Sequence, residues 1–231
     1  NADVAQPAKA TLTRMEGKAV DAELLKRWSQ ASGKTRQVIV ELAALRRIEA
    51  AVPAVLKSAE DADPGIRRAA YGTLGTLGSA QHSGDLARLL SKTQNGDDRE
   101  AIESSLTAIC SRHGAKCLPH ILPLAKSNDS ELRVTGLRSL ATIGGPEALG
   151  AVVSAVQDSE ESVQDEAVGI LATWPNNWPE DTSVAEPLLS LAKTGRKPAY
   201  KVQGVRGYLL HLQENKKMSN PDKLSAIDPL L

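Results

Sequence analysis

The residues best suited to chemistry lie in one short stretch, Cys110-Ser-Arg-His113-Gly-Ala-Lys-Cys117-Leu-Pro-His120. Thiolate and imidazole groups are good zinc ligands, and four of them complete a tetrahedral site. The spacing matches no common zinc motif, however, and two cysteines this close can also form a disulfide or stay as thiols. We therefore rank a disulfide between Cys110 and Cys117 first and two thiols second. A metal site of Cys110, His113, Cys117 and His120 ranks last.

No other residue pattern indicates catalysis. The sequence has no glycine-rich phosphate loop, no His-Glu-x-x-His motif and no Gly-x-Ser-x-Gly motif. The histidines have no serine or carboxylate near them at a recognised catalytic spacing. We therefore predict that the chain is not an enzyme and needs no cofactor.

The composition favours a helical protein without strong overall charge. The 231 residues include 28 Lys and Arg against 28 Asp and Glu, and this balance argues against a dedicated nucleic-acid binder. Phe is absent, so the core must consist of Ala, Leu, Val and Ile, which suits closely packed helices. No apolar run is long enough to span a membrane.

The elements that carry these residues repeat along the chain. Six anchor residues lie at intervals of 32, 32, 34, 31 and 37, namely Leu42, Leu74, Leu106, Leu140, Leu171 and Tyr208. Around each anchor the apolar residues follow helical spacing, as in Ile66, Ala70, Leu74 and Leu77. A shorter helix precedes each of these helices and often starts at a proline, as at Pro53. Each unit is therefore predicted to be a helical hairpin.

The turn inside each hairpin carries polar residues at matching places. An acid or amide is followed four residues later by a cation or amide, in the pairs Asp63 and Arg67, Asn95 and Arg99, Asp129 and Arg133, and Glu160 and Gln164. The first member of such a pair can cap the second helix, and the second can bridge to the neighbouring hairpin.

The segments at 61–70 and 74–78, Asp-x-Asp-Pro-x-Ile-Arg-x-Ala-Ala and Leu-x-x-Leu-Gly, resemble the HEAT-repeat family and its bacterial PBS-lyase-like branch. The resemblance extends over residues 19–213. It implies an all-α fold, a right-handed α-solenoid of about six HEAT-type hairpins plus a terminal helix. Val205-Arg-Gly-Tyr-Leu-Leu and Leu171-Ala-Thr-Trp-Pro resemble the last repeats of HEAT arrays appended to large exported bacterial proteins.

The flanking residues are expected to differ from the array. Residues 1–18 are predicted to be a linker or frayed N-terminus, and residues 214–231 a polar turn with a partial or capping terminal helix. The resemblance to exported arrays, together with the disulfide, favours an exported location over a cytoplasmic one.

The outward positions of the predicted second helices suggest what the array binds. These positions hold four cations, Arg36, Arg68, Arg138 and Arg206, against two acids. Four cations are too few for a groove that follows a nucleic-acid backbone. The remaining small side chains would let a polypeptide approach closely, and Trp178, in a loop between hairpins, could stack on a carbohydrate or anchor a partner.

These features predict a non-catalytic scaffold that mediates protein–protein or interdomain interaction. One alternative is an accessory module of an exported sugar-active or redox enzyme. Another is a lyase-like or glycosylase-like HEAT enzyme, which would need an acid–aromatic pocket that the outward positions lack.

Overall fold

The computed structural model describes residues 2–230 as helices joined by short turns, without a β-strand among them. The chain divides into two compact units, of which the first ends at His113 and the second begins at Gly114. None of the described helices is long and apolar enough to cross a membrane.

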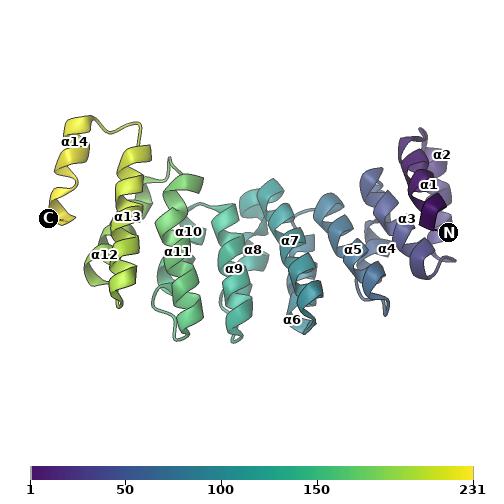
Figure 1. Ribbon diagram of the computed structural model, residues 1–231, viewed down its shortest axis with the longest axis horizontal. Helices are drawn as coiled ribbons and strands as arrows, with labels where there is room; N and C mark the ends of the chain where they lie inside the picture. Colours follow the sequence, from purple (N-terminus) through teal and green to yellow (C-terminus); the bar gives the residue numbers. More distant parts are fainter. Residues whose placement is uncertain (1, 231) are drawn as a thin grey trace. The chain divides into compact units, whose positions relative to one another are not determined.

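The first unit contains seven α-helices and one short 3₁₀ helix, arranged side by side (Figure 1). They are α1 (Ala2–Arg14), α2 (Lys18–Trp28), α3 (Gly33–Leu45), η1 (Glu49–Ala51), α4 (Val52–Ser58), α5 (Pro64–Leu77), α6 (His82–Lys92) and α7 (Gly96–His113).

The second unit continues the same alternation of helices. Its elements are η2 (Gly114–Cys117), α8 (Leu118–Leu124), α9 (Ser130–Ile143), α10 (Pro146–Ala155), α11 (Glu161–Asn177), η3 (Thr182–Val184), α12 (Ala185–Thr194), α13 (Pro198–Glu214), α14 (Asn220–Ser225) and η4 (Asp228–Leu230).

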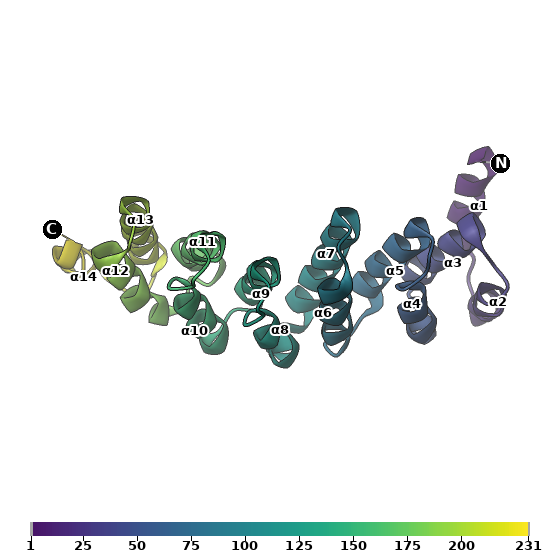
Figure 2. The same ribbon diagram turned by 90° about the horizontal axis from the view of Figure 1, so that it is seen from below.

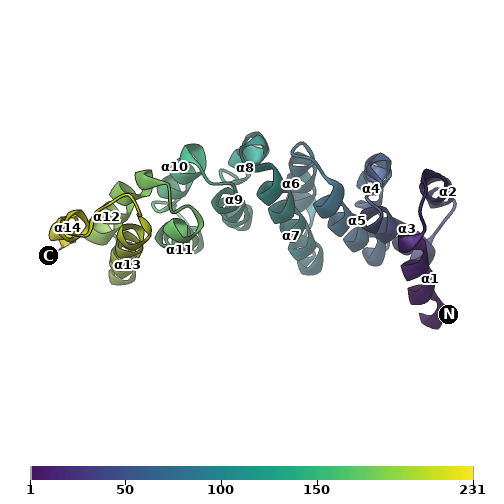
Figure 3. The ribbon, with the colours of Figure 1, turned by 90° about the horizontal axis from the view of Figure 1, so that it is seen from above.

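Consecutive helices pack as six hairpins, which confirms the predicted all-α solenoid arrangement. The first helices of the hairpins are α2, α4, α6, α8, α10 and α12, and the second helices are α3, α5, α7, α9, α11 and α13. Within each unit the second helices pack against one another and lie on one side, with the first helices on the other (Figures 2 and 3). The six anchor residues are all buried, as the repeat pattern requires.

The N-terminal residues differ from the sequence prediction. Residues 1–18 were expected to be a linker or frayed N-terminus, whereas Ala2–Arg14 form helix α1, which packs against α3. The Arg46 guanidinium holds its end by donating to the carbonyls of Leu12 and Met15. An isolated helix of this length is marginal in water, so α1 depends on contacts from residues far along the chain.

After α13 the chain forms a turn and then the short helix α14. The Ser219 hydroxyl caps α14 by accepting a hydrogen bond from the Asp222 amide. The Tyr208 hydroxyl on α13 donates to the Ala226 carbonyl at 3.0 Å and so ties this segment to the last hairpin.

The polar residues of the hairpin turns act largely as predicted. Asp63 and Asp129 cap α5 and α9, since each carboxylate accepts hydrogen bonds from two backbone amides. Glu160 is different, because its side chain makes no capping hydrogen bond at the start of α11. Its own amide instead donates to the Asp158 carboxylate at 2.9 Å.

Arginines near the starts of α5 and α9 connect neighbouring hairpins. The Arg67 guanidinium binds the buried Asp98 carboxylate of the next hairpin, with Nη2 and Oδ2 2.7 Å apart, and also donates to the carbonyls of Asp61 and Ala62. Arg133 repeats this arrangement in the second unit, where it binds Asp158 at 2.9 Å. The Arg67 guanidinium therefore satisfies two turn carbonyls and a buried acid at once.

Protonation of the buried His211 is expected to destabilise the fold as the pH falls below about 6.5. Burial lowers the pKa of His211, and the nearby Asp181 carboxylate offsets only part of that effect. The unfolded chain therefore binds a proton at a pH where the folded chain does not. The resulting stability is present above the unfolded pKa and is lost as the pH falls through it.

We expect the melting temperature of the wild type to fall more steeply between about pH 7.5 and about pH 5.5 than that of His211→Gln. His120→Gln, on the half-buried face of α8, is the matched control and should keep the wild-type slope. Equal slopes for the wild type and His211→Gln would show that His211 does not govern this transition.

Candidate functional site

The four arginines predicted for the binding surface lie on second helices, and three of them are engaged by acids of a neighbouring hairpin. Arg36 binds Asp61 at 3.0 Å, Arg68 lies 3.5 Å from Asp97, and Arg138 makes two bonds to Glu166, at 2.9 and 2.7 Å. Arg206, on α13, is exposed. Acids therefore neutralise three of these four cations locally.

Trp178 is half-buried rather than freely exposed. Its indole Nε1 donates to the Ala141 carbonyl at 2.9 Å, and its ring covers Gly144 so closely that an added Cβ there would lie 2.3 Å from the ring. The rest of the ring borders a hollow of about 320 Å³ with Thr142 and Asn177. The tryptophan thus joins the fourth and fifth hairpins, and its binding of a carbohydrate or partner stays a prediction.

The Cys and His residues of the predicted cluster lie on three elements, Cys110 and His113 at the end of α7, Cys117 at the end of η2 and His120 on α8. Cys110 and Cys117 are both fully buried, and His113 Nε2 lies 3.1 Å from the Gly78 carbonyl oxygen. No group of three or more His, Cys, Asp and Glu side chains in residues 2–230 is arranged to hold a metal ion. The disulfide between Cys110 and Cys117 stays a prediction.

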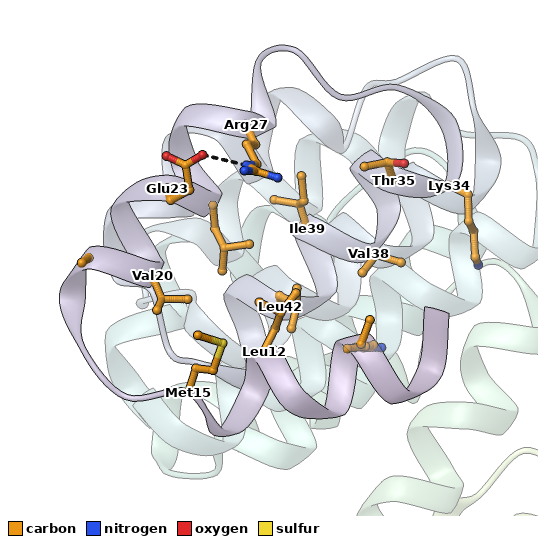
Figure 4. Close-up of a pocket in the computed structure, with 14 residues that line it drawn as sticks. Leu12, Met15, Val20, Glu23, Arg27, Lys34, Thr35, Val38, Ile39 and Leu42 are labelled. Atoms are coloured by element: carbon orange, nitrogen blue, oxygen red, sulfur yellow. Dashed lines mark hydrogen bonds and ion pairs between the residues drawn. The ribbon is translucent and has the colours of Figure 1, made fainter. Parts of the chain in front are cut away.

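A large cavity, which the sequence reasoning missed, lies between α1, α2 and α3 in the first unit (Figure 4). Its volume is about 880 Å³, within the range of pockets that take ligands. Apolar side chains from all three helices line it, namely Ala8, Leu12, Met15, Ala19, Val20, Leu24, Val38, Ile39 and Leu42. The charged residues of its lining are Lys9, Glu23, Arg27 and Lys34.

The signal for this cavity was present in the sequence. Ala8, Leu12 and Met15 follow the i, i+4, i+7 spacing of a helical stripe, although they lie in the segment expected to be a linker. What the sequence does not reveal is that Glu41 and Arg46, more than thirty residues away, fix α1 against α3.

A comparison with protein families supports this architecture over part of the chain. The family model described as HEAT repeats matches residues 22–107. No curated protein matches the sequence.

Two solved structures are similar over most of the chain. One is the crystal structure of an engineered protein from the Northeast Structural Genomics Consortium, with 17% identity, a TM-score of 0.47 and coverage of 83% of this chain and 96% of the other. The second is the complex of CpcE and CpcF of phycocyanin lyase from Nostoc sp. PCC7120, with 18% identity, a TM-score of 0.39 and coverage of 93% and 84%. Neither likeness bears on the function of this chain.

Proposed function

We propose that the chain is a non-catalytic scaffold that binds another protein or a neighbouring domain of its own polypeptide. The match of residues 22–107 to the HEAT-repeat model supports this proposal. The partner would approach the exposed sides of the second helices.

Two glycines of the second helices carry this proposal. Gly72 in α5 and Gly169 in α11 each stand two residues before their anchor leucine, in the interior of a helix. A Cβ added at either position would meet no atom within 4 Å, so the packing of this chain does not require glycine there. Glycine inside a helix is less stable than alanine by roughly 0.5–1 kcal/mol. Close approach of a partner's backbone is a physical reason for a glycine at such a position.

Gly75 shows what a glycine required by internal packing looks like. An added Cβ there would lie 3.1 Å from the Cα, Cβ and Oγ of Ser105 on the next second helix. Gly72, only three residues earlier, has open space instead. The contrast supports an external role for Gly72.

Alanine at the two open positions is expected to stabilise the protein. Gly72→Ala and Gly169→Ala should each raise the free energy of unfolding by roughly 0.5–1 kcal/mol, because alanine restricts the unfolded chain and meets no clash in the folded one. Urea denaturation followed by circular dichroism measures this. A loss of stability in either variant would mean that the glycine serves the fold itself.

Bulky substitutions at the same positions test the binding role. Gly72→Trp and Gly169→Trp should lose partners that cross-linking mass spectrometry finds on the wild-type second helices. Gly150→Trp is the matched control, because Gly150 is also an open helix-interior glycine but lies on the first helix α10. Cross-links on the second helices that persist in all three variants would contradict the proposal.

An accessory role beside an exported sugar-active or redox enzyme is the second candidate. Two observations favour it, the half-exposed Trp178 beside its hollow and the net charge of −5 in residues 151–200, from three Lys or Arg against eight Asp or Glu. An acidic surface can orient a basic partner domain. Export, the disulfide and carbohydrate binding belong to this proposal.

A further inference from the structure

We propose that the cavity between α1, α2 and α3 docks an acidic amphipathic α-helix of a partner protein. The proposal rests on the binding role proposed above and adds this cavity as a second binding site.

The cavity is apolar because α1, α2 and α3 each direct apolar side chains toward it. Leu12 projects from α1, Met15 follows the end of that helix, Val20 projects from α2, and Val38 and Leu42 project from α3 (Figure 4). Leu24, Ile39 and Leu42 form a floor that is at least nine-tenths buried, whereas Met15 at the wall is 47% exposed. An exposed methionine beside a buried aliphatic floor is a surface that adapts well to an apolar ligand.

Polar contacts hold the cavity open. The Arg46 guanidinium, only 7% exposed, donates to the Leu12 and Met15 carbonyls, and its Nε lies 2.7 Å from the Asp21 carboxylate. Lys9, earlier on α1, forms an ion pair with Glu41 on α3. Because polar contacts fix α1 at these two places, its apolar side chains face the cavity without filling it. The site is therefore preformed, which reduces the cost of binding.

The arrangement of the first unit indicates that the occupant is a helix. Helix α1 lies on the side of the second helices α5 and α7, and α2 lies on the side of the first helices (Figures 2 and 3). Apolar stripes of α1, α2 and α3 wall the cavity, with Leu12 on α1, Val20 on α2 and Val38 on α3. A groove with such walls takes an amphipathic helix that carries apolar residues at i, i+3, i+4 and i+7.

The charges at the rim indicate that this helix is acidic. Lys9, Arg27 and Lys34 are the cations of the lining, and Glu23 is its single described acid. Lys9 is paired with Glu41, and Arg27 is paired with Glu23 at 2.7 Å, whereas Lys34 donates to the neutral Gln37 side-chain oxygen at 3.0 Å. Residues 1–50 carry a net charge of +3, from nine Lys or Arg against six Asp or Glu. Acidic residues beside the apolar stripe of the partner would complement this end of the chain.

A displayed library of helical peptides of roughly four turns, with randomised positions, tests the proposal on the whole chain without knowledge of the partner. We expect the selected peptides to carry aliphatic residues at helical spacing and an excess of Asp and Glu. Synthetic copies of the selected peptides should bind the variants Val38→Glu and Lys34→Glu roughly tenfold or more weakly than they bind the wild type. The charge-reversal control, Lys92→Glu on the exposed surface of α6, should stay within about twofold of the wild type.

The test includes a cavity-filling variant and a small-molecule probe. Because Val38→Glu could unfold the first hairpin, Ala19→Trp, which fills the cavity from an exposed position, should also abolish binding. Palmitate is the small-molecule probe, and saturable palmitate binding with no peptide selected would overturn the helix as occupant. The proposal would also be overturned if the selected peptides bound all three cavity variants as tightly as the wild type, or if the library yielded no binder.

These failures can be told apart from failure of the proposed function. The cavity lies among α1, α2 and α3, whereas the tryptophan variants at Gly72 and Gly169 alter α5 and α11. Partners lost from those variants, together with a cavity that selects no peptide, would overturn this inference alone.

Discussion

Alanine in place of Gly136 or Gly204 is expected to destabilise the protein by roughly 3 kcal/mol or more. At Gly136 on α9 an added Cβ would lie 2.5 Å from the Ala125 nitrogen, just after α8. At Gly204 on α13 it would lie 2.4 Å from the Ala192 nitrogen on α12. The atoms met are backbone atoms, so no side-chain rotation relieves the clash and the two helices of the hairpin must separate.

Chemical denaturation of Gly136→Ala and Gly204→Ala measures the effect, with Gly169→Ala as the control. Gly169 is also a helix-interior glycine of the second unit, but its surroundings are open. The same substitution should therefore have opposite signs at these sites. A loss below about 1 kcal/mol in both clashing variants would show that the hairpins tolerate wider spacing.

The second large effect concerns the ion pair that links two hairpins of the first unit. Arg67→Met leaves the Asp98 carboxylate, which is 2% exposed, without its guanidinium partner. Removing one member of a buried pair costs about 3–5 kcal/mol, because the other charge stays desolvated. The two turn carbonyls that Arg67 binds also lose a donor. We expect this variant to lose roughly 3 kcal/mol in denaturant titrations.

Arg68, the residue next to Arg67, provides the matched control. Its Nη1 lies 3.5 Å from the Asp97 carboxylate in an exposed ion pair. Arg68→Met removes this pair and should change the free energy of unfolding by less than about 1 kcal/mol. The double variant Arg67→Met/Asp98→Leu should recover a large part of the loss, because no buried charge remains. A double variant as unstable as the single one would show that the turn carbonyls, rather than the acid, account for the effect.

The repeat pattern predicted the hairpins well because each hairpin is specified locally. Anchor residues such as Leu74 and Leu140 are buried as their spacing requires, and Asp63 and Asp129 cap the helices that follow them. Local spacing and capping chemistry are visible in a sequence. They decide where a helix begins and which of its faces is buried.

The candidate sites depend on contacts between distant residues, and these the sequence does not display. The stripe of Leu12 and Met15 indicates a helix, but the cavity beside it exists only because Glu41 and Arg46 fix α1 against α3. Trp178 was expected at the surface as a binding residue, but Gly144, on the preceding hairpin, leaves room for its ring. The open space at Gly72 likewise becomes visible only when its neighbours are placed.

The short reach of the contacts has a mechanical consequence. Among the described side-chain hydrogen bonds, the greatest separation along the chain is 37 residues, from Trp178 to Ala141. A tension applied between the two ends therefore loads the hairpins in series, without one clamp that must break before the others. Each hairpin of about 32 residues would release roughly 110 Å of contour length as it unravels. Such a protein yields in small steps under force, as an extensible tether does.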